Sequence, residues 1–182
     1  MKVTRLRLAL VGAVVAVAVL AAPAGAGNAG DGTRALASRA ALEHSIVGEI
    51  NALRASRGLP RLSVSKPLAL AARSHSRDMA LTGYFSHTSR NGQAFDQRVR
   101  HYYGSRGYRT WRAGENLLWA SPEVDADRAV QMWIDSPAHK RILLTRGYRE
   151  IGLSAVHMVA GRGSYAGMEV TIVTADFGAR FR

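Results

Sequence analysis

The sequence predicts a single domain of the α+β class, and three observations carry this prediction. Apolar residues recur at helical spacing from about residue 39 to 58 and again from 68 to 83. Two apolar stretches near the C-terminus, residues 151–159 and 168–177, flank a glycine-rich turn and are typical of a β-hairpin. Helices that come first and strands that come last indicate segregated rather than alternating elements.

Length and composition agree with one folded domain. The chain has 182 residues, of which 47% are hydrophobic, so it can bury a core of its own. The sequence contains no internal repeat and no sign of a second domain.

The first 26 residues have the layout of a secretory signal peptide. They consist of the cations Lys2, Arg5 and Arg7, an apolar run from Leu8 to Leu20, and the small residues Ala24-Gly25-Ala26. We expect cleavage after Ala26, with Ala22 as the alternative. A retained anchor is the competing interpretation, but the apolar run is shorter than the roughly 20 residues of a membrane-spanning helix.

This interpretation divides the chain into a signal peptide (1–26), a flexible linker (27–39) and a folded domain (40–182). The linker is expected from the small, polar, Gly/Ala-rich composition after the signal. We therefore expect a secreted protein, extracellular or associated with the cell wall, without a transmembrane segment after cleavage.

The absence of cysteine excludes several classes of site. The chain cannot carry a thioether-linked lipid, a disulfide, a cysteine metal site or a catalytic thiol.

The formal charge is +12, and without Lys2, Arg5 and Arg7 it is +9. Such a charge favours an anionic envelope surface as a neighbour, whereas nucleic acid is not expected because the arginines are scattered and the protein is exported.

The two N-terminal helices are predicted from their apolar stripes and from the glycines that follow them. The stripes are Leu42, Ile46, Ile50 and Leu53 before Gly58, and Leu68, Ala72, His75 and Met79 before Gly83. Because His75 lies on an apolar stripe, we interpret it as a packed, hydrogen-bonded core residue rather than a ligand.

The middle of the chain is predicted as loop, with a short helix at 95–102 and an extended segment at 113–119. A third helix is expected to begin at Ser121, with Pro122 in its first turn, and to end at Ser136. Pro137 then starts a further helix at once, with Ser136 as its N-cap. This places His139 in a first helical turn, where the helix dipole favours a neutral imidazole able to accept a proton or bind a metal.

Three residues far apart in the sequence are the candidate site: His87, Glu115 and His139. They supply two imidazoles and one carboxylate, which only the fold could bring together. Spacing alone does not establish that it does.

A series of short motifs resembles the CAP superfamily of cysteine-rich secretory proteins, antigen 5 and plant pathogenesis-related proteins, and in particular its cysteine-free bacterial branch. The resemblance runs from about residue 40 to the C-terminus and rests on the motifs Asn51-x-x-Arg54, His75-Ser76-x-Asp78-Met79, Phe85-Ser86-His87, Gly114-Glu115-Asn116-Leu117, Trp133-x-x-Ser136-Pro137-x-His139, Glu150-Ile151-Gly152 and Asp176-Phe177-Gly178.

The resemblance implies a three-layer α–β–α sandwich with a small antiparallel sheet. It also implies a cavity with two histidines, which fall on His87 and His139, and two acidic residues, the first of which falls on Glu115. The second acidic position is Ser136 here, and Ile142 replaces an asparagine common in bacterial members. Several family members hold a divalent metal at this cavity, so the resemblance implies His87, Glu115 and His139 as candidate ligands of zinc or calcium.

Several functions remain open from the sequence. The candidate residues could form a structural polar network, a metal-binding pocket, or the catalytic group of a metal-assisted or Glu/His-based hydrolase. The sequence lacks the H-E-x-x-H and G-x-S-x-G signatures of hydrolases. A binding module for an extracellular lipid, glycan or protein fits the resemblance better, and a wall protein held by charge alone is a further alternative.

Overall fold

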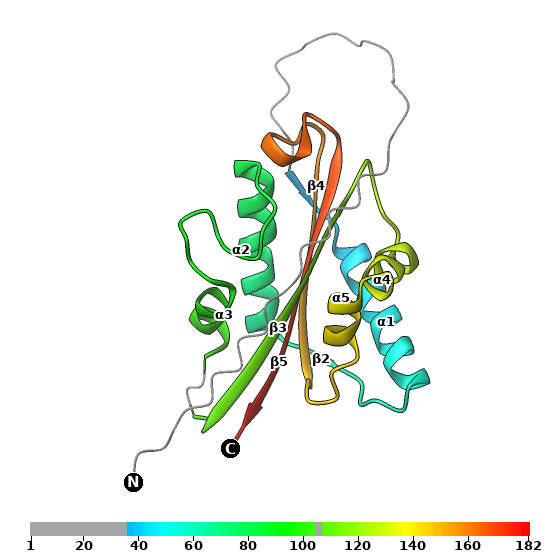
Figure 1. Ribbon diagram of the computed structural model, residues 1–182, viewed down its shortest axis with the longest axis vertical. Helices are drawn as coiled ribbons and strands as arrows, with labels where there is room; N and C mark the ends of the chain where they lie inside the picture. Colours follow the sequence, from blue (N-terminus) through cyan, green and yellow to red (C-terminus); the bar gives the residue numbers. More distant parts are fainter. Residues whose placement is uncertain (1–35, 105–106) are drawn as a thin grey trace.

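The structure, a computed structural model, describes residues 36–104 and 107–182. A five-stranded sheet lies between two helical layers, so the predicted α+β class and three-layer sandwich are confirmed (Figure 1). The helices are α1 (Ala40–Ser56), α2 (Lys66–Thr82), α3 (Phe95–Tyr103), α4 (Ala126–Asp135), α5 (Pro137–Leu143) and the short 3-10 helix η1 (Gly163–Tyr165). The strands are β1 (Leu36–Ser38), β2 (Ser63–Val64), β3 (Thr110–Ala120), β4 (Glu150–Met158) and β5 (Val170–Phe181).

The sheet is built around the predicted C-terminal hairpin. Strands β4 and β5 pair antiparallel, and the order across the sheet is β1-β4-β5-β3. The short β2 pairs with β4 in parallel. Strand β3 runs antiparallel to β5 along its whole length and begins at Thr110, earlier than the predicted 113–119.

Each face of the sheet supports its own helical layer. In Figure 1, α2 and α3 lie on one side of the sheet, and α1, α4 and α5 lie on the other. Because successive side chains of a strand point to opposite faces, Leu118 packs with α1, α4 and α5, whereas Leu117 and Trp119 pack with α2. The same alternation directs Glu115 toward the α2–α3 layer.

One predicted helix boundary differs from the structure, and another is confirmed. Helix α4 begins at Ala126 rather than at Ser121, because Asp125 is the N-cap and its carboxylate accepts from the N–H of Arg128 at 2.8 Å. Pro122 lies outside the helix, and its carbonyl accepts from the hydroxyl of Thr171 at 3.3 Å. The predicted break at Ser136 is confirmed, since α4 ends at Asp135 and α5 begins at Pro137, although the Ser136 side chain makes no capping hydrogen bond.

The N-terminal predictions fall largely outside the described residues. The signal peptide and most of the linker lie there and stay predictions. The last part of the predicted linker differs from expectation, because Leu36–Ser38 forms β1 and pairs with β4. Among the described residues, no helix is long and apolar enough to cross a membrane.

A buried arginine joins the helical layer of α1 to the segment after α5. Arg54 has no exposed surface, and it donates hydrogen bonds to the carbonyls of Pro60, Leu143 and Thr145 at 2.9, 2.7 and 3.2 Å. Since a buried cation requires such partners, this residue fixes where the chain turns from α5 toward β4.

We predict that Arg54→Ala lowers the free energy of unfolding by about 3 kcal/mol, because several buried carbonyls lose their donor. The measurement is urea unfolding at neutral pH. Arg57→Ala is the matched control, since Arg57 is exposed at the end of the same helix and its loss should change stability by less than about 0.5 kcal/mol. Equal effects of the two substitutions would contradict this role of Arg54.

Candidate functional site

Glu115 is a buried carboxylate held between an imidazole and a guanidinium. Its side chain is 1% exposed, His87 donates from Nδ1 to Oε1 at 2.8 Å, and Arg98 forms an ion pair with Oε2 through Nη2. Burial by itself raises the pKa of Glu115, but the hydrogen bond from His87 and the charge of Arg98 outweigh it. The pKa therefore lies below its usual value, and Glu115 is ionised at neutral pH.

Three separate elements bring this group together. Glu115 points from β3 toward the α2–α3 layer, and Arg98 comes from α3. His87 lies in the loop after α2, which ends at Gly83 in a left-handed conformation with φ of 75°. Arg98 also donates from Nη1 to the carbonyl of His87 at 3.0 Å and to the hydroxyl of Ser89 at 3.1 Å, so it anchors the loop as well as the carboxylate.

Asp176 is a second buried carboxyl group beside Glu115. It is the register partner of Glu115 on the neighbouring strand β5, and it has no exposed surface. Neither of its oxygens has a hydrogen-bond donor among the described residues. Burial and the negative charge of Glu115 raise the pKa of Asp176 well above its usual value. Asp176 therefore keeps its proton to a higher pH than an exposed aspartate, and as an acid it can donate to Glu115.

Close packing seals the carboxyl pair from the side of α2. Gly152 on β4 is the other register partner of Asp176, and a side chain there would meet the backbone nitrogen of Ala69 at 2.0 Å. Only glycine lets α2 approach the sheet this closely.

The sequence motifs included Asp176, but Asp176 was not predicted as part of the site. The signal that could have identified it is an acidic residue inside an otherwise apolar strand.

His75 completes the polar cluster under the loop. Its Nε2 lies 2.8 Å from the carbonyl of Ser86, and its ring is buried, as predicted for a core histidine. Burial lowers the pKa of His75 to about 4, and the nearby Glu115 offsets only part of this effect. At neutral pH His75 is therefore uncharged and donates to Ser86.

His87 and Glu115 are brought together as predicted, whereas His139 belongs to a different layer. His139 is buried in the first turn of α5, and its carbonyl accepts from Asn116 Nδ2 at 3.1 Å. Asn116 follows Glu115 on β3 and so points to the opposite face of the sheet. Convergence of the His139 imidazole with His87 and Glu115 stays a prediction.

The arrangement around Glu115 does not fit a divalent ion. Among the described residues, no group of three or more His, Asp or Glu side chains is placed to hold one. Both oxygens of Glu115 already have partners, and one partner is the cationic Arg98. The zinc or calcium site expected from the sequence at His87, Glu115 and His139 is untested, the partners of Glu115 count against it, and no chemistry below depends on it.

A cleft of about 460 Å³ opens beside this cluster, between α2, α3 and the loop that joins them. Helix α2 contributes Ser74, His75 and Asp78 to its wall, and α3 contributes Arg98, His101 and Tyr102. The loop contributes Ser89, Asn91 and Gln93. Two of these wall residues, His75 and Arg98, belong to the Glu115 cluster, so the buried group supports the cleft.

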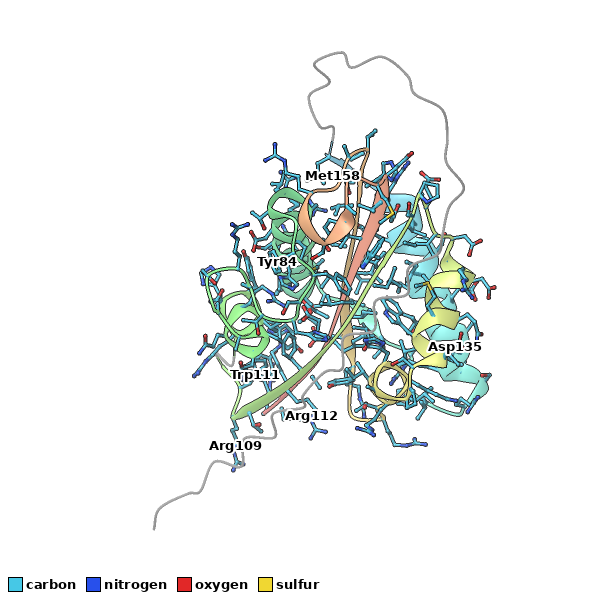
Figure 2. The ribbon with its side chains drawn as sticks, turned by 45° about the horizontal axis from the view of Figure 1, so that its top comes forward. Tyr84, Arg109, Trp111, Arg112, Asp135 and Met158 are labelled. Carbon is cyan, nitrogen blue, oxygen red and sulfur yellow. The ribbon has the colours of Figure 1, made fainter. Side chains whose placement is uncertain are left out.

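Tyr84, at the start of the loop between α2 and α3, shows on which side of the sheet the cleft lies. Tyr84 follows α2 and donates to the carboxylate of Asp78 at 2.6 Å. Figure 2 labels Tyr84 on the α2 side of the sheet and Asp135 on the opposite side, at the end of α4. The cleft and the His139 helix therefore lie in different helical layers.

Comparison with known sequences finds a family match over most of the chain. Residues 47–177 match the profile described as CAP, the cysteine-rich secretory protein family. Two relatives from Bacillus subtilis are each 33% identical: an uncharacterized membrane protein, YlbC, over 61% of this chain, and an uncharacterized protein, YkwD, over 74%. The matches cover 30% and 50% of those relatives, so this chain corresponds to only part of each.

Solved structures share the fold. An extracellular protein from Bacillus anthracis that contains an SCP domain is similar over 76% of this chain and 40% of its own, with a TM-score of 0.57 and 28% identity. An outer surface protein of Borrelia burgdorferi is similar over 81% of this chain and 99% of its own, with a TM-score of 0.60 and 20% identity.

We predict that Asp176→Asn raises the melting temperature increasingly as pH rises. In the wild type, Asp176 ionises in the unfolded chain above about pH 4, whereas in the fold its raised pKa keeps the proton to a higher pH, so its burial costs stability as pH increases. The gain should be small at pH 4 and at least about 3 °C at pH 8, on the order of 1 kcal/mol. Asp135→Asn, an exposed control on α4, should leave the pH profile unchanged. Parallel profiles for wild type and Asp176→Asn would contradict the assignment.

Calorimetry with Zn²⁺ and Ca²⁺ near pH 7 tests the metal site. Because Arg98 neutralises Glu115, we expect no saturable binding to the wild type. Saturable heat that disappears in both His87→Ala and His139→Ala would contradict this expectation and support the ligand set predicted from the sequence.

Proposed function

Since this chain belongs to the cysteine-rich secretory protein (CAP) family, we propose that it is an exported binding module that takes an extracellular ligand in the cleft between α2 and α3. The observation that carries the proposal is the cleft itself. Its volume of about 460 Å³ falls within the usual range of small-molecule sites, about 300–1,000 Å³.

The walls of the cleft are held in place before any ligand arrives. Arg98 connects α3 to β3 through Glu115 and to the loop through the carbonyl of His87. His75 connects α2 to the same loop through Ser86. A site built in this way loses little conformational entropy on binding, which favours affinity.

Three findings support a location outside the cell. The N-terminus has the composition of a signal peptide. One solved relative is described as extracellular and another as an outer surface protein. The predicted mature charge of +9 favours adhesion to an anionic envelope, which would keep the domain near its ligand.

The hydrolase alternative has less support. Glu115 and Asp176 form an acid and base pair, but the Glu115 side chain is 1% exposed and Asp176 has no exposed surface. General acid–base catalysis needs a group within hydrogen-bonding reach of the substrate. The carboxyl pair is therefore better explained as a support for the cleft than as a catalytic group.

Retention on a cell envelope at high salt tests this proposal. Purified protein without its signal peptide is bound to an envelope fraction of Bacillus subtilis and washed with about 1 M salt, where the screening length is about 3 Å and adhesion by charge is lost. We expect retention of the wild type and at least about tenfold weaker retention of Ser74→Trp, which fills the cleft from an exposed position on α2.

The matched control is Gln97→Trp, because Gln97 is exposed on α3 but does not line the cleft. It should be retained like the wild type. Complete release of the wild type at 1 M salt, or equal retention of Ser74→Trp, would refute binding through the cleft.

A further inference from the structure

The wall of the cleft differs in its chemistry from a lipid-binding or protein-binding surface. Its side chains carry hydroxyl, amide, imidazole, carboxylate and guanidinium groups, and none is aliphatic. We infer that the ligand of this cleft is an uncharged oligosaccharide. This inference rests on the proposed function, because it names the ligand class of the same site.

An acyl chain would gain little free energy in this cleft. Burial of apolar surface contributes roughly 25 cal/mol per Å² only when the surface leaves water for an apolar environment. The exposed apolar residues of α2, Leu70 and Leu81, are absent from the cleft wall. A lipid tail would therefore contact hydroxyl and amide groups and displace water that they bind.

A folded protein partner also fits poorly. Stable protein interfaces bury about 800 Å² on each side around a core depleted of charged residues. The cleft is a concave space of about 460 Å³ with Asp78, Arg98 and two histidines in its wall. Its size and polarity suit a few sugar rings better than a protein surface.

Arg98 and His75 offer no unpaired positive charge to a ligand in the cleft. Arg98 is paired with Glu115, and Asp78 accepts a hydrogen bond from Tyr84. His75 is uncharged at neutral pH because burial lowers its pKa to about 4. An anionic ligand would therefore find no unpaired cation on Arg98 or His75, whereas a neutral polar ligand needs none.

The loop between Ser89 and Gln93 is a rigid source of hydrogen bonds. The N–H of Ser89 donates to the carbonyl of Gln93, and the N–H of Gly92 donates to the carbonyl of Ser89, both at 2.9 Å. The N–H of Gln93 donates to the Asn91 side chain at 3.0 Å. The Gln93 amide can donate and accept at once, as vicinal sugar hydroxyls do, so the two groups are complementary.

Tyr102 adds an aromatic surface to this polar wall. It is half-buried and meets His101 edge to face, with ring centroids 4.8 Å apart. An aromatic ring offers an apolar face together with a polar hydroxyl. The C–H face of a pyranose ring can lie on such a surface while its hydroxyls bond to the amides.

The test removes protein and lipid from the envelope and asks whether binding remains. The probe is the insoluble polysaccharide residue of a Bacillus subtilis envelope after protease digestion and chloroform–methanol extraction, with binding measured in about 1 M salt, where only short-range contacts persist. We expect the wild type to bind this residue as well as it binds the untreated envelope.

A pair of glutamine variants assigns that binding to the cleft. Gln93→Ala should weaken binding to the polysaccharide residue by about tenfold, or roughly 1.4 kcal/mol. Gln97→Ala, which removes the same side chain outside the cleft, should bind like the wild type. Matching thermal unfolding of the two variants shows that any difference does not arise from folding.

The outcomes separate this inference from the function on which it rests. Binding to the untreated envelope that is lost after protease or solvent extraction overturns the oligosaccharide inference and leaves the binding module intact. Equal binding of Gln93→Ala and Gln97→Ala to the polysaccharide also overturns it. Failure of the wild type to bind even the untreated envelope refutes the proposed function itself.

Discussion

The buried charge of Glu115 is the constraint on which the functional half of this domain depends. A carboxylate with a 1% exposed side chain is stable only when cations and donors surround it, and His87 and Arg98 provide them. Because these partners come from the loop after α2 and from α3, satisfying Glu115 also fixes both elements against β3. Burial and the charge of Glu115 then favour the protonated form of the adjacent Asp176 carboxyl group, since two negative charges side by side in a buried site would repel.

This arrangement separates the electrostatic support of the domain from its accessible surface. The ion pair of Glu115 and Arg98 lies beneath the wall, while the cleft presents mainly hydroxyl and amide groups. A cleft of this kind can discriminate ligands by hydrogen bonding without strong attraction to every anion in a cell envelope. The basic remainder of the surface could then supply adhesion, so affinity for the envelope and selection of the ligand would come from different residues.

Local signals in the sequence account for most of the fold. Periodicity predicted α1 and α2, and the apolar stretches around a glycine-rich turn predicted the β4–β5 hairpin. Pro137 marked the break between α4 and α5. The short strands β1 and β2 pair through only two or three residues, too few to show a period. The start of α4 was placed too early because Ser121-Pro122 and Asp125 are both good start signals, and only the packing around Pro122 decides between them.

The candidate site was less predictable, because its partners are defined by register and layer rather than by spacing. His87 and Glu115 were candidates from their residue types and from the resemblance, and the structure joins them directly. Arg98 lay in the short helix predicted at 95–102, but no local pattern paired it with Glu115, and Asp176 becomes a neighbour of Glu115 only through the β3–β5 register. His139 looked equivalent to His87 in the sequence, yet its helix packs against the other face of the sheet. Such relations arise from long-range pairing that single-sequence patterns do not contain.

The central claim is that the fold shifts the pKa values of the two buried carboxyl groups in opposite directions, down for Glu115 and up for Asp176. Carbon-13 NMR of the side-chain carboxyl carbons of Glu115 and Asp176, recorded from about pH 3 to pH 9, measures both states directly around their ordinary pKa values near 4. The account predicts that Glu115 stays ionised at pH values where an exposed glutamate is protonated, and that Asp176 keeps the chemical shift of the acid well into the neutral range. Titration of both groups close to pH 4, as for exposed carboxylates, would contradict it.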